Sequence, residues 1–458
     1  MDSSSARVRG AGSLARPGRC LPRRLARLDA ERTHGAAERQ ATIAAALDAS
    51  VSKPAPAARG RERAALAAVA EKLEAAGASL TIEAPGGPPL RLGPRPEAAR
   101  VRFLDAAALA PLARGDHLAL AEAYLHGAID LEGDLAEVMK VTDVLTLDES
   151  RWDRVRLALG LWLRGRRAMN REAVAFHYDR PPEFFLPWLE RWRSYSHGFW
   201  SGPDDDPSAA QARKMQHAID ALGLRPGDRV LDMGAGWGCF VEYAGRQGIR
   251  VHGITISREQ HRFVERLIRE QGLPCSVELV DFFAYRPSQP FAGAVFLGTF
   301  EHVGDYAYAA DFLRRHLVPG GRVYADFCAT REGFHGGRFL KKWIWPGAVT
   351  YVDVGALVGA LARAGFDVHE LADDTLSYAW TVRDWALRFD AHEKALGEQF
   401  GTATVRAFRL FLWASYHFLA HDRTQAYHLV AGLGPRERHQ ARPAPATHAN
   451  ANASPSRA

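Results

Sequence analysis

The 458-residue chain is predicted to be an α/β protein with a doubly wound, mostly parallel sheet and a smaller α+β domain before it. Two observations predict the sheet. From about residue 225, compact apolar runs alternate with helical stretches at the spacing of βαβ units, and the first run opens on a glycine-rich turn. A third observation predicts the smaller domain, because short alternating segments separated by Gly and Pro precede this region.

The α/β region predicts five strands in order. We expect them over Arg229–Met233, Arg250–Ile256, Ser276–Val280, Ala292–Leu297 and Gly321–Phe327. Parallel strands need crossover connections, and helical stretches such as Arg258–Gln271 and Tyr306–His316 supply them.

Composition divides the chain into four parts. Residues 1–64 alternate Arg and Ala with little apolar periodicity and are predicted to be a disordered or loosely helical leader. Residues 434–458 are rich in Pro, Ala, Asn and His and are predicted to be a disordered tail. Residues 65–165 are expected to hold the α+β domain and a linker, with a lipid-handling or dimerising role or a purely structural one. Residues 166–433 are expected to hold the sheet domain.

The overall composition excludes several classes of protein. No stretch approaches the roughly 20 uninterrupted apolar residues that a membrane span needs. The four cysteines show no CxxC spacing, so neither a zinc site nor a disulfide framework is indicated, and we expect a reducing, cytoplasmic setting. The start of the chain lacks the apolar run of a secretory signal, although its Arg, Ala and Ser leave a transit peptide as an alternative.

The formal net charge of +6 suits contact with an anionic surface. Nucleic acid and phospholipid headgroups both provide one, and the charge alone does not choose between them. The basic leader is most simply a solvated run of charge.

The glycine turn carries the first functional signal. Gly234, Gly236 and Gly238 follow a strand and precede a helix, where the backbone turns sharply and approaches a ligand closely. The GxGxG spacing with Asp232 two residues ahead is typical of methyltransferases. The second strand ends in Thr255–Gln260, without the acid that holds an adenine ribose in dinucleotide enzymes. A tight turn that binds nothing is the alternative.

Further motifs make the signal specific. They are His177-Tyr-Asp with Phe184-Phe185, Tyr195-Ser-His-Gly-Phe-Trp200, the glycine turn, Thr255–Gln260, Phe300-Glu-His-Val-Gly304, Trp345-Pro-Gly and the stretch from Tyr378 to Phe389. In this order and spacing the chain resembles the cyclopropane-fatty-acyl-phospholipid synthase family and its mycolic-acid methyltransferase relatives, over roughly residues 100–433. The run Ala121-Glu-Ala-Tyr124, Gly127 and Asp130-Leu-Glu-Gly-Asp134 looks like the N-terminal domain of the longer members.

The resemblance implies a Rossmann-like class I methyltransferase domain and S-adenosylmethionine as cofactor. The matching cofactor positions are Tyr195 and Ser196 at the methionine end, Asp232, Gly234, Gly236 and Gly238 at the turn, Thr255, Ser257 and Gln260 around the ribose, and Asp281 and Phe282 at the adenine. Ser257 also has a purely structural interpretation as a helix N-cap with Gln260 completing a capping box, and the two roles can coexist.

The resemblance also implies the reaction, which is methyl transfer to the double bond of an unsaturated phospholipid acyl chain. The product is a cyclopropane or a methyl- or methylene-branched chain. In the family the base is a bound bicarbonate, and Glu301 and Tyr378 match two of the residues that hold it. Two positions depart from the family pattern, since His197 replaces a usual Cys and Asp326 replaces a usual His; Cys328 also stands where an aliphatic residue is expected.

The change to Asp326 matters electrostatically. A carboxylate about 4 Å from bicarbonate is repelled by about 4 kcal/mol at an effective dielectric constant near 20. Either Asp326 is protonated or bicarbonate is absent, and His197 is expected to compensate as a cation. The alternative is that Asp326 and His197 supply the base directly, and drift at an inactive site is a third interpretation.

Two other functions remain open on the sequence alone. One is a methyltransferase of a small amine or phenol, since plant N-methyltransferases resemble the same domain, and the other is an inactive lipid-binding relative. We expect no metal and no nucleic-acid partner. The expected partners are phospholipid acyl chains, met peripherally at the inner membrane surface, and a homodimer is left open.

Overall fold

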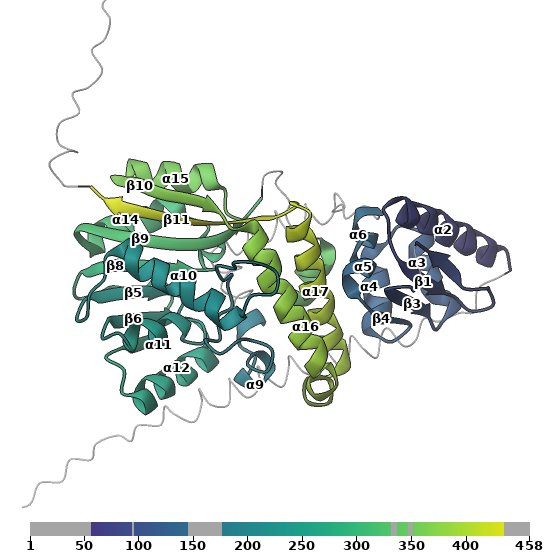
Figure 1. Ribbon diagram of the computed structural model, residues 1–458, viewed down its shortest axis with the longest axis horizontal. Helices are drawn as coiled ribbons and strands as arrows, with labels where there is room; N and C mark the ends of the chain where they lie inside the picture. The colour runs from purple at the N-terminus through teal and green to yellow at the C-terminus, as the bar shows by residue number, and fades with distance from the viewer. Residues whose placement is uncertain (1–55, 94–95, 145–175, 331–336, 347–350, 435–458) are drawn as a thin grey trace, which may run out of the picture. The chain divides into compact units, whose positions relative to one another are not determined.

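The computed structural model describes residues 56–93, 96–144, 176–330, 337–346 and 351–434 (Figure 1). Contacts divide the chain into two units, Met1–Arg59 and Gly60–Ala458, and the second holds both sheets. Most of the predicted leader and tail, and the predicted linker, lie outside the described residues. Helix α2 (Pro56–Ala75) begins before the predicted leader boundary at residue 64, within the part of the leader that could be loosely helical. Its Ala, Glu, Arg and Lys are good helix formers, and proline is tolerated in a first turn.

The main sheet is doubly wound, as predicted. Its seven strands have the order β10-β11-β9-β8-β5-β6-β7, with β9, β8, β5, β6 and β7 parallel and β11 antiparallel to both of its neighbours. The strands are β5 (Arg229–Met233), β6 (Arg250–Thr255), β7 (Ser276–Leu279), β8 (Phe291–Leu297), β9 (Leu317–Ala329), β10 (Phe366–Asp373) and β11 (Gln425–Leu433). All five predicted strands are present, and only their ends differ.

Helices cover both faces of this sheet (Figure 1). They are α10 (Pro207–Leu222), α11 (Cys239–Gly245), α12 (Arg258–Gln271), α13 (Phe300–Val303), α14 (Tyr306–His316) and α15 (Val354–Arg363). Two neighbouring residues of β5 show which helices cover which face, because successive side chains of a strand point to opposite faces of the sheet. Val230 packs in a core with α10, α11 and α12, whereas Leu231 packs in a core with α14 and α15.

Strands β10 and β11 were not predicted. β10 lies at the edge of the sheet, and most of its residues are polar or partly exposed, so it lacks the apolar run of a buried strand. β11 is reached only after two long helices, α16 (Thr375–Phe400) and α17 (Thr402–Ala420). It then enters the sheet between β9 and β10, a connection that local sequence does not reveal.

The N-terminal region is a small α+β structure, also as predicted. Its sheet has the order β2-β1-β3-β4, formed by β1 (Leu80–Glu83), β2 (Leu90–Leu92), β3 (Ala99–Phe103) and β4 (Ile129–Gly133). Around it lie α2, η1 (Ala106–Leu109), α3 (Ala110–Ala113), α4 (His117–Leu125), α5 (Leu135–Met139) and α6 (Val141–Val144). Within the same unit α17 contacts α4 and α5, and Arg406 on α17 donates to the Tyr124 carbonyl at 2.8 Å.

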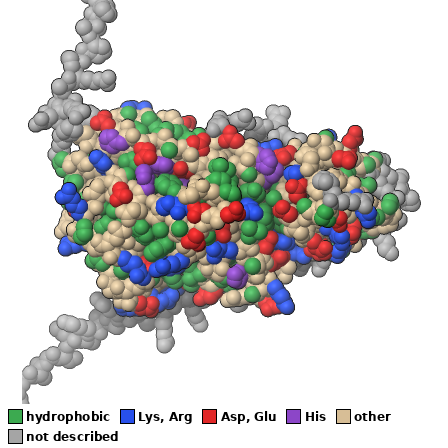
Figure 2. Space-filling view, in the orientation of Figure 1, with side chains coloured by type: hydrophobic (Ala, Val, Ile, Leu, Met, Phe, Trp, Pro, Cys, Tyr) green, Lys and Arg blue, Asp and Glu red, His purple; other side chains and the backbone are tan. Residues whose placement is uncertain are grey.

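Two surface observations bear on function. Among the described residues no helix has both the length and the apolarity needed to cross a bilayer. On the face drawn in Figure 2, basic and acidic side chains are interspersed rather than gathered into a patch of one sign.

Candidate active site

The glycine turn lies at the carboxyl end of β5, where a doubly wound sheet binds its ligands. Gly234 and Gly236 have φ of +87° and +52°, in the left-handed region that favours glycine. A Cβ at Gly234 would collide with Thr299 Cγ2, so no other residue fits there. A Cβ at Gly236 would meet only open space, with the Gly234 carbonyl 3.9 Å away. The chain therefore keeps a cradle clear of side chains.

This turn forms one wall of a cavity of about 160 Å³. Most of the residues predicted to bind the cofactor line it: Tyr195, Ser196, Asp232, Gly234, Gly236, Thr255, Gln260, Asp281 and Phe282. Gly238 and Ser257 do not line the cavity. Gly238 is the N-cap of α11, with φ of +79°. Gly238 therefore sets the start of α11, and Ser257 caps the start of α12, without either lining the cavity.

Asp232 gives the cavity its electrostatic character. Both of its carboxylate oxygens are buried and have no hydrogen-bond partner among the described residues. Burial raises its pKa to about 7, the Lys214 ammonium opposes this and Asp326 adds to it. A buried carboxylate without donors is unfavourable unless a ligand supplies them. The ammonium group at the methionine end of S-adenosylmethionine is such a donor, so this residue fits the cofactor.

The residues predicted to bind the ribose and the adenine are fixed in place by hydrogen bonds and ring packing. Thr255 Oγ1 donates to Gln260 Oε1 at 2.9 Å, which fixes two polar side chains on the cavity wall. Asp281 Oδ1 accepts from the Phe283 amide at 2.8 Å, and the Phe282 ring packs edge-on against Phe312. Hydroxyl and amide groups suit ribose hydroxyls, and an aromatic face suits a base.

Ser257 follows its structural interpretation. Its Oγ accepts from the Gln260 amide at 3.3 Å as the N-cap of α12, and its hydroxyl also lies 3.3 Å from the Tyr178 carbonyl. The Gln260 side chain bonds to Thr255 instead of returning to Ser257, so the predicted capping box is not reciprocal.

Glu301 stands beside the cofactor cavity, at the start of α13. The Cys328 amide donates to Glu301 Oε1 at 2.6 Å. Burial raises the pKa of Glu301 to about 7, against the lowering effect of that amide, and Asp326 raises it further. Burial also raises the pKa of Tyr378, followed by the effects of Cys328 and Glu301. The structure thus brings together Glu301, Tyr378 and Cys328, three residues singled out from the sequence.

Asp326 and His197 do not form the pair expected from the sequence. Asp326 Oδ2 lies 3.2 Å from Lys214 Nζ, with both side chains fully buried, and its Oδ1 accepts from the Gly298 amide at 2.6 Å. His197 Nε2 instead lies 3.0 Å from Asp374 Oδ2. The cation that compensates Asp326 is therefore Lys214 rather than His197. This corrects the expectation, because neutralising a buried carboxylate requires a charge in direct contact with it.

Lys214 and Asp374 were missed by sequence reasoning. Lys214 carried a signal, since Ala210, Lys214, Ala218 and Leu222 recur every four residues on α10 and all are buried. A lysine on such an apolar stripe needs a buried acid. Asp374 carried no comparable signal, because it only precedes α16 in the sequence.

Five aromatic rings pack together next to Glu301, and Tyr178, Tyr195 and His302 among them line the cofactor cavity. We call His177, Tyr178, Tyr195, His302 and Trp345 the aromatic wall. Trp345 stacks on His177 and His302 with centroids 4.0 and 4.9 Å apart, and Tyr178 meets Trp345 edge-on at 5.4 Å. Burial lowers the pKa of His302 to about 4 and that of His177 well below its usual value. Both imidazoles are therefore neutral near pH 7, and the wall presents uncharged π faces.

The described residues do not fit the bicarbonate ion that the resemblance implies. Glu301 and Asp326 already raise the energy of negative charge there, since Asp326 raises the pKa of Glu301. Asp326 stands in place of the expected histidine, and its oxygens are engaged by Lys214 and the Gly298 amide. Asp326, already paired with Lys214, offers an added anion no donor in place of the expected histidine, and Glu301 repels that anion when it is ionised.

Comparison with known proteins agrees with this geometry. The family described as mycolic acid cyclopropane synthetase matches residues 166–429, more than half of the chain. The chain belongs to this family. It is an S-adenosylmethionine-dependent methyltransferase, as the glycine turn predicted.

Several relatives of this family member are lipid-modifying proteins by name. A probable fatty acid methyltransferase of Pseudomonas putida is 28% identical over 309 residues, covering 64% of this chain and 76% of that protein. A sphingolipid C9-methyltransferase B of Emericella nidulans is 27% identical, covering 64% and 60%. The cyclopropane-fatty-acyl-phospholipid synthase of Escherichia coli is 31% identical over 242 residues, covering 52% and 61%. The chain thus spans about three fifths of the length of the last two.

Solved structures show the same fold. The cyclopropane synthase MmaA2 from Mycobacterium tuberculosis superposes with a TM-score of 0.54 at 23% identity, covering 57% of this chain and 98% of that one. The mycolic acid cyclopropane synthase CmaA1, complexed with SAH and CTAB, gives a TM-score of 0.53 at 21% identity, with the same coverage.

Proposed function

We propose that this methyltransferase transfers the methyl group of S-adenosylmethionine to the double bond of an unsaturated phospholipid acyl chain. The observation that carries the proposal is the aromatic wall beside Glu301. An alkene is a weak nucleophile, and its attack on a methyl group leaves a carbocation. Neutral rings stabilise a cation through their π faces without competing as nucleophiles. The cofactor supplies the electrophilic methyl group.

A second cavity supports an acyl substrate. It encloses about 240 Å³ and is lined mostly by apolar side chains of the N-terminal sheet and helices, together with α17 and Tyr351. Tyr351 connects it to the reaction centre, because Cys328 and Glu301, after burial, raise the pKa of this phenol. An apolar cavity lined in part by Tyr351, whose phenol senses the charge of Glu301, suits a hydrocarbon chain better than a small polar amine.

We assign two tasks to Glu301, which are to stabilise the cation and to accept the proton that it loses. As the alkene π electrons form the new carbon–carbon bond, the sulfur–methyl bond breaks and a cation forms on the chain. The Glu301 carboxylate stabilises this cation and accepts a proton, since a base with a pKa of about 7 is suited to neutral pH. Proton loss from the added methyl closes a cyclopropane, and loss from a neighbouring carbon leaves a methylene branch. Asp326 is engaged in its ion pair with Lys214. We therefore assign the acceptance of the proton to Glu301 rather than to Asp326.

The test supplies the full chain with S-adenosylmethionine bearing a deuterated methyl group and an unsaturated phospholipid in detergent. We expect label in the acyl chains, found by mass spectrometry of the fatty acid methyl esters, and proton NMR then locates the added carbon. A phospholipid with the same headgroup and saturated chains is the matched control and should stay unlabelled. Label that is found in both intact lipids but absent from their fatty acid methyl esters would indicate headgroup methylation, and no label in the esters of the unsaturated lipid would refute an acyl substrate.

A further inference from the structure

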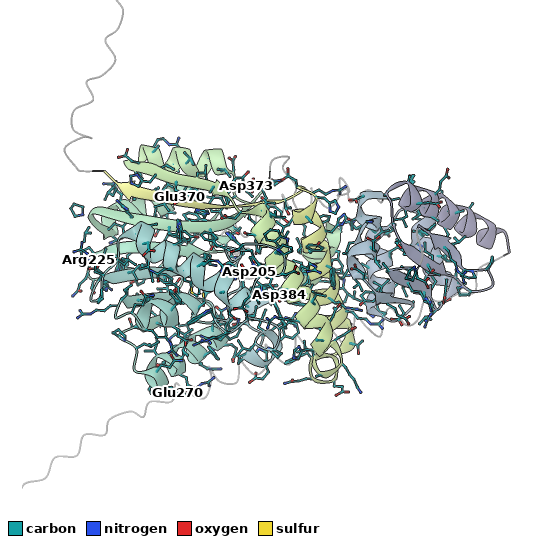
Figure 3. All side chains as sticks on the ribbon, in the orientation of Figure 1. Asp205, Arg225, Glu270, Glu370, Asp373 and Asp384 are labelled. Atoms are coloured by element: carbon teal, nitrogen blue, oxygen red, sulfur yellow. The ribbon has the colours of Figure 1, made fainter. Side chains whose placement is uncertain are left out.

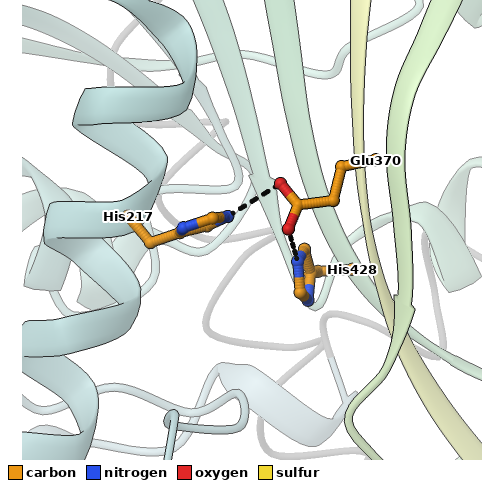
Figure 4. Close-up of side chains that lie close together, drawn as sticks. All are labelled: His217, Glu370 and His428. Atoms are coloured by element: carbon orange, nitrogen blue, oxygen red, sulfur yellow. Dashed lines mark hydrogen bonds and ion pairs between the residues drawn. The ribbon is translucent and has the colours of Figure 1, made fainter.

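Three side chains outside the cofactor cavity converge on one point (Figure 4). They are His217 on α10, Glu370 on β10 and His428 on β11, and their ligand atoms all lie within 4.8 Å of one another. Figure 3 shows Glu370 on the upper part of the sheet. His217 Nε2 lies 3.1 Å from Glu370 Oε2, and His428 Nε2 lies 3.1 Å from Glu370 Oε1. Each imidazole therefore meets a different oxygen of the same carboxylate.

The fold itself brings the three together. Ala372 pairs with His428 across β10 and β11, so Glu370, two residues along β10, lies diagonally opposite His428 on the same face of the sheet. Helix α10 covers that face, contacts β9 and contributes His217. Because the three residues stand on three packed elements, their positions are fixed by the core rather than by loops.

The tautomer of His428 is set by a neighbour. Its Nδ1 lies 2.5 Å from Asp374 Oδ2, and a carboxylate only accepts, so Nδ1 carries the proton. In the neutral imidazole the Nε2 lone pair then faces Glu370. His428 is only 5% exposed, yet its Nε2 makes no hydrogen bond among the described residues despite its closeness to Glu370. A lone pair held against a carboxylate is unfavourable, so a positive charge is needed between Nε2 and Glu370, and either a proton on Nε2 or a bound metal ion supplies it.

A second buried group beside the cluster also lacks a partner. The Tyr324 ring stacks on His428 and lies edge-on to His217, with centroids 5.9 and 6.0 Å apart. Its side chain is fully buried, and its hydroxyl has no hydrogen-bond partner within the described part of the chain. A metal-bound water is one group that would supply it.

From these contacts we propose that His217, Glu370 and His428 bind a divalent transition-metal ion, with Zn²⁺ the best match. Two imidazoles and one carboxylate form a ligand set that zinc accepts, at bond lengths of about 2.0–2.2 Å. Tetrahedral geometry at those lengths separates neighbouring ligand atoms by about 3.3 Å, close to the two contacts with Glu370. The side chains of His217 and Glu370 are 33% and 38% exposed, which leaves a path for the ion and a place for water.

Asp374 completes the site and connects it to the reaction centre. A carboxylate that holds the far nitrogen of a histidine ligand orients the ring and raises its basicity. The same Asp374 Oδ2 lies 3.0 Å from Nε2 of His197, which follows the cofactor residue Ser196. The Asp374 carbonyl also accepts from the Tyr378 amide at 2.9 Å. A metal at His428 would therefore restrain both His197 and the start of α16.

The test uses the full, untagged chain after treatment with a chelator. Calorimetry against Zn²⁺ should give one ion per chain with micromolar or tighter affinity, and zinc should raise the melting temperature. Co²⁺ should give the visible spectrum of a tetrahedral site with nitrogen and oxygen ligands. Glu370→Gln and His217→Asn, at partly exposed positions, should weaken binding by more than the tenfold to hundredfold loss expected for Asp374→Asn.

The matched control is His252→Asn. His252 also faces a glutamate, Glu278, at 3.6 Å, but no second histidine joins that pair among the described residues, so binding should be unchanged. S-adenosylmethionine binding by each variant shows that it is folded. Absence of tight zinc binding, or binding unaltered in both Glu370→Gln and His217→Asn, would overturn the proposal. A Co²⁺ spectrum with thiolate bands would overturn it as well, because it would assign the metal to cysteines.

Discussion

Replacing Glu301 by glutamine tests whether this carboxylate stabilises the cation and accepts its proton at the reaction centre. Glutamine keeps the shape of the side chain and removes the carboxylate. We expect turnover to fall by at least about a hundredfold, the low end for a lost acid–base or electrostatic partner. S-adenosylmethionine affinity should change little, since Glu301 acts on the cation and its proton rather than on the bound cofactor.

The same substitution has a pH signature in stability. The pKa of Glu301 is raised from its ordinary 4.5 to about 7, mainly by burial. As pH rises from about 4.5 to about 7, the unfolded chain ionises this group while the folded chain resists. Stability from the raised pKa is therefore present at low pH and lost through this window. Raising this pKa from 4.5 to about 7 corresponds to about 3 kcal/mol, a loss that glutamine at this position does not have.

Urea denaturation of both proteins at about pH 5 and about pH 8 measures this effect. The stability of Glu301→Gln relative to the wild type should rise by about 2.5 kcal/mol between the two conditions, because pH 5 already lies above the ordinary pKa of 4.5. Wild-type turnover should also fall as pH drops below about 7. Glu270→Gln, at an exposed position on α12 (Figure 3), is the matched control and should change neither quantity. Equal pH dependence of stability in wild type and Glu301→Gln, or full activity of the variant, would refute the reasoning.

Three further predictions concern the cofactor, the buried ion pair and the base. Gly236→Val should abolish S-adenosylmethionine binding by calorimetry in a folded protein, because its side chain would enter the open cradle at a φ of +52°; unchanged affinity would remove the cofactor assignment. Lys214→Met should lower the free energy of unfolding by about 3–5 kcal/mol, since it strands the buried Asp326 carboxylate, and adding Asp326→Asn should recover part of the loss. Activity should survive in bicarbonate-depleted buffer and fall further in Asp326→Ala than on bicarbonate removal; strict bicarbonate dependence would return the enzyme to the family mechanism.

The sequence predicted correctly those elements whose bounds depend on neighbouring residues. The strand Arg229–Met233 and the helices Arg258–Gln271 and Tyr306–His316 were predicted with their observed bounds, because each has a clear apolar pattern and a defined end. The glycine turn was equally readable, since its left-handed φ values can be met only by glycine at low cost.

Long-range pairs were the part that sequence could not supply. Lys214 and Asp326 lie on a helix and a strand far apart in the chain, and His197 meets Asp374 across 177 positions. Without these pairings, His197 rather than Lys214 was expected to compensate the charge of Asp326. The functions predicted for Glu301 and Tyr378 came from a motif, while the raised pKa of each comes from burial that only the folded chain creates.

The late strand β11 has a consequence for biosynthesis. It lies between β9 and β10, yet it is made after both of them and after α16 and α17. Until residues 425–433 leave the ribosome, β9 and β10 each present an unpaired edge, and the nascent sheet is an aggregation hazard. The cofactor cradle at β5 can form earlier, but His428 reaches Asp374 only when β11 is inserted. A chain that stops before β11 should therefore emerge with its cofactor strands complete and its sheet open, as a substrate for chaperones rather than an enzyme.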